Sequence, residues 1–350
     1  MKGLVLMNIW VALGLSIAVG FTVSFLSGYG LIPFLHKLKF GQTILDIGPS
    51  WHKKKQGTPT MGGFLFILGF SLSLIAVLVT DKLMGGELLI AGREMQSDVV
   101  YTKIFAGLLF AAANGFIGFI DDYIKVVKKR NLGLTELQKT VMQLAVAVVY
   151  MFTLARFAGV NFMWIPYVGV VTNSVLFWFI GIIAIYCTVN AANFTDGVDG
   201  LCSSVTSVIC VFFAAVAALR RFTGLSVVCC CLFGALLGFL MWNHNPAKVM
   251  MGDVGSLFLG AMVTSFAFTL DMPWIILLIA VVYVMEFGSD ILQIAYVKTH
   301  NGKRLFKMAP IHHHYEMSGW SEKKICLVFS VIGIIGGAAA LALVWFGRDM

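Results

Sequence analysis

Charge is scarce in this chain. Of its 350 residues only 12% are Asp, Glu, Lys or Arg, whereas 59% are hydrophobic. A soluble domain of this size needs a charged surface, so the composition excludes that class. Uninterrupted apolar runs of about 18 residues or more recur instead, and a run of that length crosses a bilayer. The sequence therefore predicts an all-α, polytopic integral membrane protein.

Four other features are missing from the sequence. No linker rich in serine or proline and no internal repeat divides the chain, so we expect one membrane-embedded domain over residues 1–350. The first apolar run, Leu4 to Leu35, lacks a small-residue cleavage site after a short core, and we expect it to be retained as a span. None of the seven cysteines forms a CxxC pair, which favours packing over metal binding.

Hydropathy predicts ten spans, and the distribution of basic residues predicts their orientation. The loops that follow odd-numbered spans, with their immediate flanks, hold 17 of the 25 Lys and Arg residues. Such an excess marks the cytoplasmic side, so both termini are expected outside. The predicted spans are 11–35, 61–80, 101–120, 137–157, 172–192, 201–219, 225–242, 255–270, 274–296 and 325–346.

The unusual polar stretches fall in these same odd-numbered loops. Because irregular backbone cannot face lipid, any site must form where helix ends meet water. Five segments that are distant in the sequence therefore indicate one composite site in a cleft on the cytoplasmic face. They are WHKKKQGTPTMGG (51–63), DDYIKVVKKR (121–130), NAANFTDGVDG (190–200), NHNPAKVMMGDVGS (243–256) and KRLFKMAPIHHHYE (303–316).

The acids of these loops have two explanations. Asp196, Asp199 or Asp253 could each cap a helix start, and Asp121 with Asp122 could simply be solvated. A cluster of oxygen ligands on one membrane face instead suggests Mg²⁺, which bridges and neutralises phosphates. The joint pattern favours the metal, because Ser or Asn caps a helix equally well.

Lysines and histidines complete the candidate site. Lys125 shares a helix face with Asp121 at i+4 and is expected to attract an anionic substrate. For His312, His313 and His314 we favour hydrogen bonding to phosphate or acid–base work over zinc, since consecutive histidines converge poorly on one ion.

A second polar face lies on the predicted span 274–296. Glu286, Asp290 and Gln293 follow one another at i, i+4 and i+7. They indicate either a polar groove or a buried structural network, and the sequence leaves both open.

The ordered motifs GTPTMGG, GFIDDYIK, NFTDGVDGL, NPAKVMMGDVGSL and KMAPIHHHYE resemble those of the phospho-N-acetylmuramoyl-pentapeptide transferases. These belong to the polyprenyl-phosphate N-acetylhexosamine-1-phosphate transferases. The resemblance covers about residues 30 to 345 and implies ten membrane helices and a cytoplasmic active site in the plasma membrane. It also implies a reaction with Mg²⁺: UDP-MurNAc-pentapeptide and undecaprenyl phosphate give lipid I and UMP. A homodimer occurs in the family, and we expect membrane lipid and no nucleic acid as partners.

The resemblance also implies roles for individual residues. Asp253 is the implied magnesium ligand, and Asp121, Asp122 and the histidines 312–314 are the implied catalytic groups. The residues implied to contact substrate are Lys55, Thr58, Thr60, Asn193, Asp196, Asp199 and Asn243. Phe194, Val198 and Asp290 depart from the pattern expected for the family.

Alternatives from other classes are weaker on the sequence. A transporter places ionisable residues near mid-span and shows half-chain symmetry, whereas these acids lie at span ends and no repeat is present. A scaffold gives no reason for five such loops together. A sibling transferase that uses UDP-N-acetylglucosamine is the remaining competitor.

Overall fold

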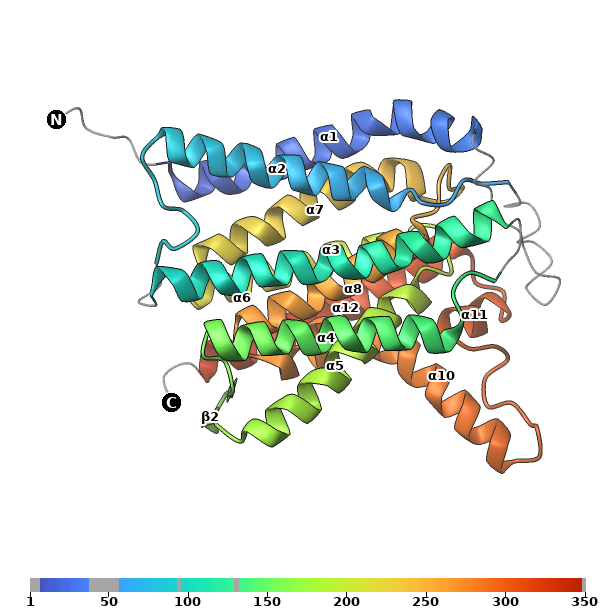
Figure 1. Cartoon of the computed structure of the whole chain (residues 1–350). Coiled ribbons are helices and arrows are strands. Elements are labelled where there is room, and N and C mark those ends of the chain that lie inside the picture. The colour runs from blue at the N-terminus through green and yellow to red at the C-terminus, as the bar shows by residue number, and fades with distance from the viewer. Residues whose placement is uncertain (1–6, 38–56, 93–95, 129–131, 348–350) are drawn as a thin grey trace.

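The computed structural model describes residues 7–37, 57–92, 96–128 and 132–347. In these residues nine helices are long and apolar enough to cross a membrane, and Figure 1 shows them as one elongated bundle. They are α1 (Ile9–Lys37), α2 (Gly63–Leu83), α3 (Ser97–Val127), α4 (Glu136–Phe157), α5 (Ser174–Thr195), α6 (Leu201–Leu219), α7 (Thr223–Asn243), α8 (Gly252–Thr269) and α12 (Glu322–Phe346). The prediction of an all-α, multi-pass membrane protein is confirmed.

The ninth predicted span, 274–296, is broken. The turn η2 (Pro273–Ile275) and α9 (Ile276–Ile279) meet α10 (Val281–Thr299) at a bend of 89°. The break falls at Ala280, whose φ of −103° and ψ of 34° lie outside the helical region. The prediction of a span over 274–296 did not include this bend, because neither proline nor glycine marks it. Figure 1 shows α10 leaning out of the bundle.

Two small elements were also not predicted. An antiparallel hairpin pairs β1 (Met163–Ile165) with β2 (Gly169–Val171), and Tyr167 and Gly169 take positive φ in and beside its turn. The short helix α11 (Ile311–Glu316) carries the histidine motif.

Helix α8 forms the centre of the bundle. In its apolar window 89% of the residues are buried, compared with 22% in that of α1. Helix α3 packs along α8 at small residues: a Cβ at Gly118 would collide with the carbonyl of Asp253, and one at Gly107 would meet the side chain of Ser265. This close contact places the end of α3 beside the start of α8.

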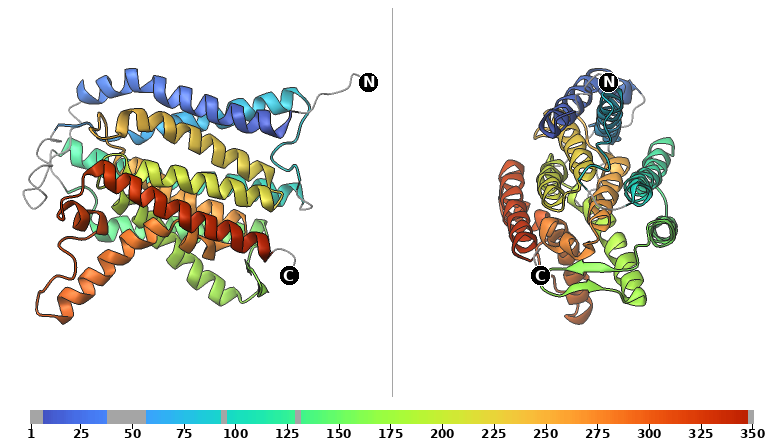
Figure 2. Two further views of the ribbon diagram at one scale, coloured as in Figure 1. Left: turned by 180° about the vertical axis from the view of Figure 1, so that it is seen from behind. Right: turned by 90° about the vertical axis from the view of Figure 1, so that its left-hand side faces the viewer.

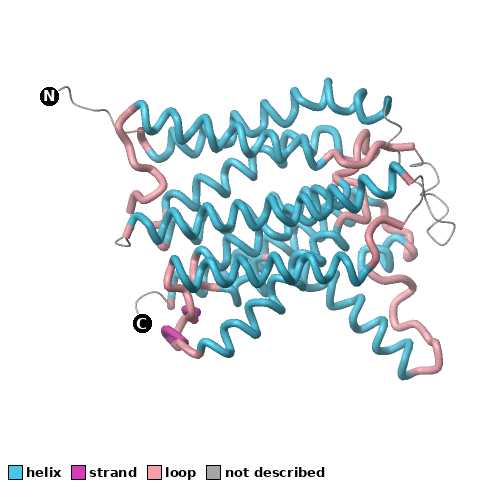
Figure 3. The backbone as a smooth tube through the Cα atoms, in the orientation of Figure 1, coloured by secondary structure: helices cyan, strands magenta, loops and turns pink. Residues whose placement is uncertain are grey.

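The loops gather at the two ends of the bundle (Figures 2 and 3). The start of α1 and the end of α12 lie at one end. The connection from α5 to α6, that from α7 to α8, and α11 lie at the other (Figure 1). The segments that carry the polar motifs therefore share one end, as the alternation of spans predicts.

A buried ion pair ties α3 to the far end of α8. Lys103 Nζ contacts Asp271 Oδ1 at 2.6 Å and Oδ2 at 2.8 Å, and the Lys103 side chain is fully buried. Asp271 follows α8 directly, and its carbonyl accepts from Trp164 N at 2.8 Å, so the pair also anchors the β hairpin.

Candidate active site

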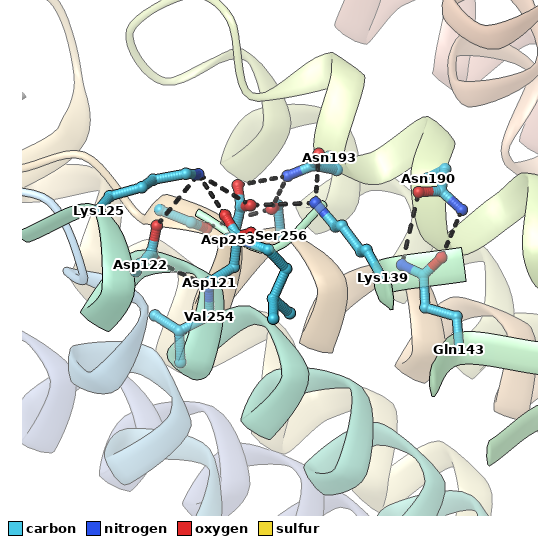
Figure 4. Close-up of polar contacts among 12 residues, drawn as sticks. Asp121, Asp122, Lys125, Lys139, Gln143, Asn190, Asn193, Asp253, Val254 and Ser256 are labelled. Atoms are coloured by element: carbon cyan, nitrogen blue, oxygen red, sulfur yellow. Dashed lines mark hydrogen bonds and ion pairs between the residues drawn. The ribbon is translucent and has the colours of Figure 1, made fainter. Parts of the chain in front are cut away.

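Three carboxylates meet where α3 and α8 come together. Asp121 and Asp122 lie near the end of α3 and are buried, whereas Asp253 lies in the first turn of α8 and is partly exposed. One oxygen from each lies within 4.8 Å of the others, and among the described residues this is the one acidic or histidine group so arranged. Figure 4 shows the three side chains around a common centre. Two of the five polar segments thus converge as predicted.

Backbone contacts fix the two acids of α3. Asp122 Oδ2 accepts from Val254 N at 3.1 Å, so a side chain from α3 satisfies a free amide at the start of α8. Asp121 Oδ1 accepts from Leu134 N at 2.8 Å. The carboxylate of Asp253 does not cap its own helix, which begins without a side-chain cap. The capping explanation for Asp253 is therefore wrong.

Two lysines bring positive charge to the cluster. Lys125 Nζ lies 3.1 Å and Lys139 Nζ 3.0 Å from Asp253 Oδ2, and Lys125 also contacts Asp121 as its i,i+4 spacing predicts. Three carboxyl groups thus face two ammonium groups, so acidic side chains outnumber basic ones at this site. Clustered carboxylate oxygens at a partly wet helix end are the ligands that Mg²⁺ prefers, so these residues fit that ion.

Asn193, at the end of α5, orients the remaining oxygen of Asp253. Its Nδ2 lies 2.8 Å from Asp253 Oδ1 and 2.8 Å from Ser256 Oγ. Lys139 Nζ reaches Asn193 Oδ1 at 3.4 Å (Figure 4). A third predicted segment thus joins the site.

The loop before α2 docks against the loop before α8. Gly62 N and Gly63 N donate to the carbonyls of Met250 and Met251 at 2.8 and 2.9 Å, and Met250 N donates to Pro59 O at 2.9 Å.

This docking brings Thr60 to the acids. Gly252 has φ +71°, and a Cβ there would lie 2.5 Å from Asp122 Oδ2 and 2.6 Å from Thr60 Oγ1. Glycine is therefore required for the turn that delivers Asp253. Thr58 is partly buried in the same loop, and Lys55 lies outside the described residues.

Asp196, Asp199 and Asn243 do not join the carboxylate cluster. The first two lie in the turn between α5 and α6, so they do not share a helix face. Asp199 Oδ2 accepts from Ala247 N at 2.9 Å and from Asn245 Nδ2 at 3.2 Å.

Asn243 is buried and holds the same loop in place. It accepts from Ser203 Oγ at 2.9 Å and donates to Val249 O at 3.0 Å. Asp199 and Asn243 thus fix the loop leading to Asp253, and substrate contact by either remains a prediction.

The three histidines face three different partners. His312 Nδ1 lies 2.9 Å from Glu286 Oε2 with both side chains buried, and His313 Nδ1 lies 2.6 Å from Glu316 Oε2. His314 Nδ1 accepts from Lys307 N at 3.1 Å. This arrangement favours hydrogen-bonding roles over a shared zinc ion.

The polar face of α10 forms contacts within the protein. Glu286 is fully buried against His312, and Gln293 Oε1 accepts from Leu305 N and Phe306 N at 3.1 and 2.9 Å. These contacts favour the structural network over an open groove.

Sequence reasoning missed Lys139 and Ser256. Ser256 follows Asp253 at i+3 in a helix, so spacing was a usable signal. Nothing in the sequence singled out Lys139 among the basic residues of its loop, because its contact depends on how α4 packs beside α5.

Comparison with known proteins identifies the family. A model of glycosyl transferase family 4 matches residues 104–271. The phospho-N-acetylmuramoyl-pentapeptide-transferase of Listeria welshimeri is 39% identical over 94% of this chain and 97% of its own. Proteins of the same name from Clostridium novyi and Clostridium perfringens are 42% and 41% identical over 91% and 92% of this chain, and over 93% and 95% of their own. The chain belongs to the phospho-N-acetylmuramoyl-pentapeptide transferase family, as its motifs predicted.

Proposed function

We propose that this protein transfers phospho-N-acetylmuramoyl-pentapeptide from UDP-MurNAc-pentapeptide to undecaprenyl phosphate, giving lipid I and UMP for peptidoglycan synthesis. The observation that carries the proposal is the trio of aspartates with two lysines at the motif-bearing end of the bundle, in a chain of this family. We place this end on the cytoplasmic side of the plasma membrane, where a nucleotide-linked donor is available.

Asp253, together with Asp121 and Asp122, would hold Mg²⁺, which supplies positive charge to the diphosphate of the donor. The reaction exchanges one pyrophosphate linkage for another, so the protein's main task is to bring two anions together. Lys125 and Lys139 offset phosphate charge beside the acids. A phosphate carried on a lipid lies at the surface of the bilayer. It can therefore reach acids that lie at the end of a membrane helix.

In the simplest route an oxygen of the lipid phosphate attacks the β-phosphorus of the donor. The bond from that phosphorus to the bridging oxygen breaks, and UMP leaves. Asp121 engages the attacking phosphate and accepts its proton when one is present. Thr58, Thr60, Asn193, His313 and His314 contact the donor, as do Lys55 and Asp196. Asp199, Asn243 and His312 are buried, so their contact with the donor requires the loops around them to open.

A two-step route through a phospho-sugar on an aspartate is the alternative. Incubating the protein with radiolabelled donor and Mg²⁺, without lipid phosphate, distinguishes the routes. Recovery of labelled protein would exclude direct attack. We expect no label.

The assay of the function is UMP release in detergent with polyprenyl phosphate. We expect release with UDP-MurNAc-pentapeptide, loss on chelation of divalent ions, and recovery when Mg²⁺ is restored. Release only with UDP-N-acetylglucosamine would reassign the donor to the sibling transferases. Full activity after chelation would overturn the proposed requirement for a divalent metal ion.

A further inference from the structure

One ammonium group occupies the centre of the acidic cluster. Lys125 Nζ lies 2.5 Å from Asp121 Oδ2, 3.1 Å from Asp253 Oδ2 and 3.8 Å from Asp122 Oδ1. It therefore faces an oxygen of every acid in the trio (Figure 4). Lys139, by contrast, contacts Asp253 alone among the three in the described contacts.

Lys125 faces the three oxygens that the backbone amides and Asn193 leave available, because Asp121 Oδ1, Asp122 Oδ2 and Asp253 Oδ1 accept from Leu134 N, Val254 N and Asn193 Nδ2. Mg²⁺ binds oxygen at about 2.0–2.1 Å in an octahedral shell, so an ion that draws on these acids must lie among oxygens within 4.8 Å of one another. An ammonium group in that space excludes the ion by volume and repels it by charge.

We propose that Lys125 is an exchangeable internal counter-ion. Its ammonium balances the three acids until a divalent ion takes its place, and it then turns outward to meet a phosphate of the substrate. The inference rests on the proposed metal site and adds that the metal and Lys125 compete for it.

The side chain is suited to this exchange. Lys125 lies near the C-terminal end of α3 and its side chain is 33% exposed, so a flexible four-carbon stem can move the charge into water. Lys139 is held more firmly: its side chain is 14% exposed, and its ammonium is also bonded to Asn193. Lys125 is therefore the lysine that a divalent ion would displace.

The test measures Mn²⁺ binding to the full-length protein in detergent by electron paramagnetic resonance, without substrate. Mn²⁺ suits the same oxygen ligands and is detected directly. Lys125→Met should bind Mn²⁺ at least about tenfold more tightly than the unaltered protein, since a charge within a few ångströms shifts cation affinity by that order. Lys128→Met is the matched control, because Lys128 is exposed and the change in charge is the same. It should alter affinity less than about twofold.

Asp253→Asn separates the two proposals. Unchanged Mn²⁺ affinity in Asp253→Asn would overturn the metal site itself. Suppose that Asp253→Asn weakens Mn²⁺ binding but Lys125→Met binds Mn²⁺ no more tightly than the unaltered protein. That result would overturn only the proposed competition between Lys125 and the metal.

A second measurement uses the unaltered chain, so it does not depend on how a variant folds. Mass spectrometry after brief lysine acylation should show Lys125 reacting faster as Mg²⁺ is added, while Lys128 stays constant. A Lys125 rate that does not respond to Mg²⁺, in protein shown to bind the metal, would overturn the exchange.

Discussion

Helix α3 carries a Lys–Asp contact near each end, and the two contacts differ in kind. At one end Lys103 meets both oxygens of Asp271 and is closed off from water. At the other, Lys125 and Lys139 face three carboxylates and remain partly exposed. Each contact includes an acid from one end of α8, Asp271 just after the helix and Asp253 in its first turn.

The difference lies in charge balance and access. A buried pair with matched charges resists rearrangement, because breaking it leaves an uncompensated charge in a medium of low dielectric constant. A wetter cluster with surplus acid can exchange one cation for another. We infer that the first contact secures the fold, whereas the second has the properties that the proposed metal site requires.

The same Asp→Asn substitution at the two ends of α8 should affect different properties, activity at one end and folding stability at the other. Asp253→Asn removes a carboxylate of the proposed metal site and should lower UMP release by about 10²–10³-fold while folding stability is kept. Asp271→Asn removes the charge of Asp271 from the buried Lys103 and should lower the free energy of unfolding by about 3–5 kcal/mol. Thermal unfolding in detergent, with activity per folded molecule, measures both. If Asp253→Asn lost stability and Asp271→Asn did not, the structural contact would be the one at Asp253.

The buried pair can be removed with less harm than either partner. Lys103→Met should destabilise by about 3–5 kcal/mol, whereas Lys103→Met with Asp271→Asn should recover most of that loss, because no unpaired charge remains. Asn also tolerates the positive φ of 62° found at Asp271. If the double variant is as unstable as the sum of the singles, ion pairing is not what secures this end.

The turn before Asp253 should be sensitive to a single methyl group. Gly252→Ala forces a Cβ to within 2.5 Å of Asp122 Oδ2 at a φ of +71°. Displacing the acids by a fraction of an ångström to 1 Å should lower turnover by up to about 10²-fold. Gly14→Ala on α1, where a Cβ meets nothing within 4 Å, is the control and should leave turnover unchanged.

The smallest effect is expected one turn behind the site. Asn190 Nδ2 donates to Gln143 Oε1 at 2.9 Å and ties α5 to α4 beside Asn193 and Lys139 (Figure 4). Gln143→Leu or Asn190→Leu alone should destabilise by about 1–3 kcal/mol, by leaving an amide unpaired. The double Leu variant should regain stability yet keep a severalfold loss of turnover. Full recovery of both would make the pair purely structural.

Hydropathy was enough to predict the helices, because crossing lipid requires long apolar stretches with satisfied backbone groups. It was not enough for the bend at Ala280, which depends on how α9 and α10 pack and has no local signal.

The site was predictable only in outline. Alternation of spans placed all the polar loops together, but it did not show which acids meet. Asp199 and Asp253 are alike in the sequence, both followed closely by glycine at the edge of an apolar run. Only Asp253 joins the cluster, because α3 approaches the start of α8 at Gly118. The domain extent of 1–350 and the homodimer remain predictions.

The close approach at Gly118 has a consequence for how the protein responds to its lipid surroundings. Bilayers of different hydrophobic thickness tilt their helices, and two loosely packed helices would slide past each other as they tilt. Because α3 is held against α8 along its length and fastened by Lys103 and Asp271 at the opposite end, we expect the two helices to tilt as one body. The distances among the three carboxylates should therefore change little with the thickness of the bilayer.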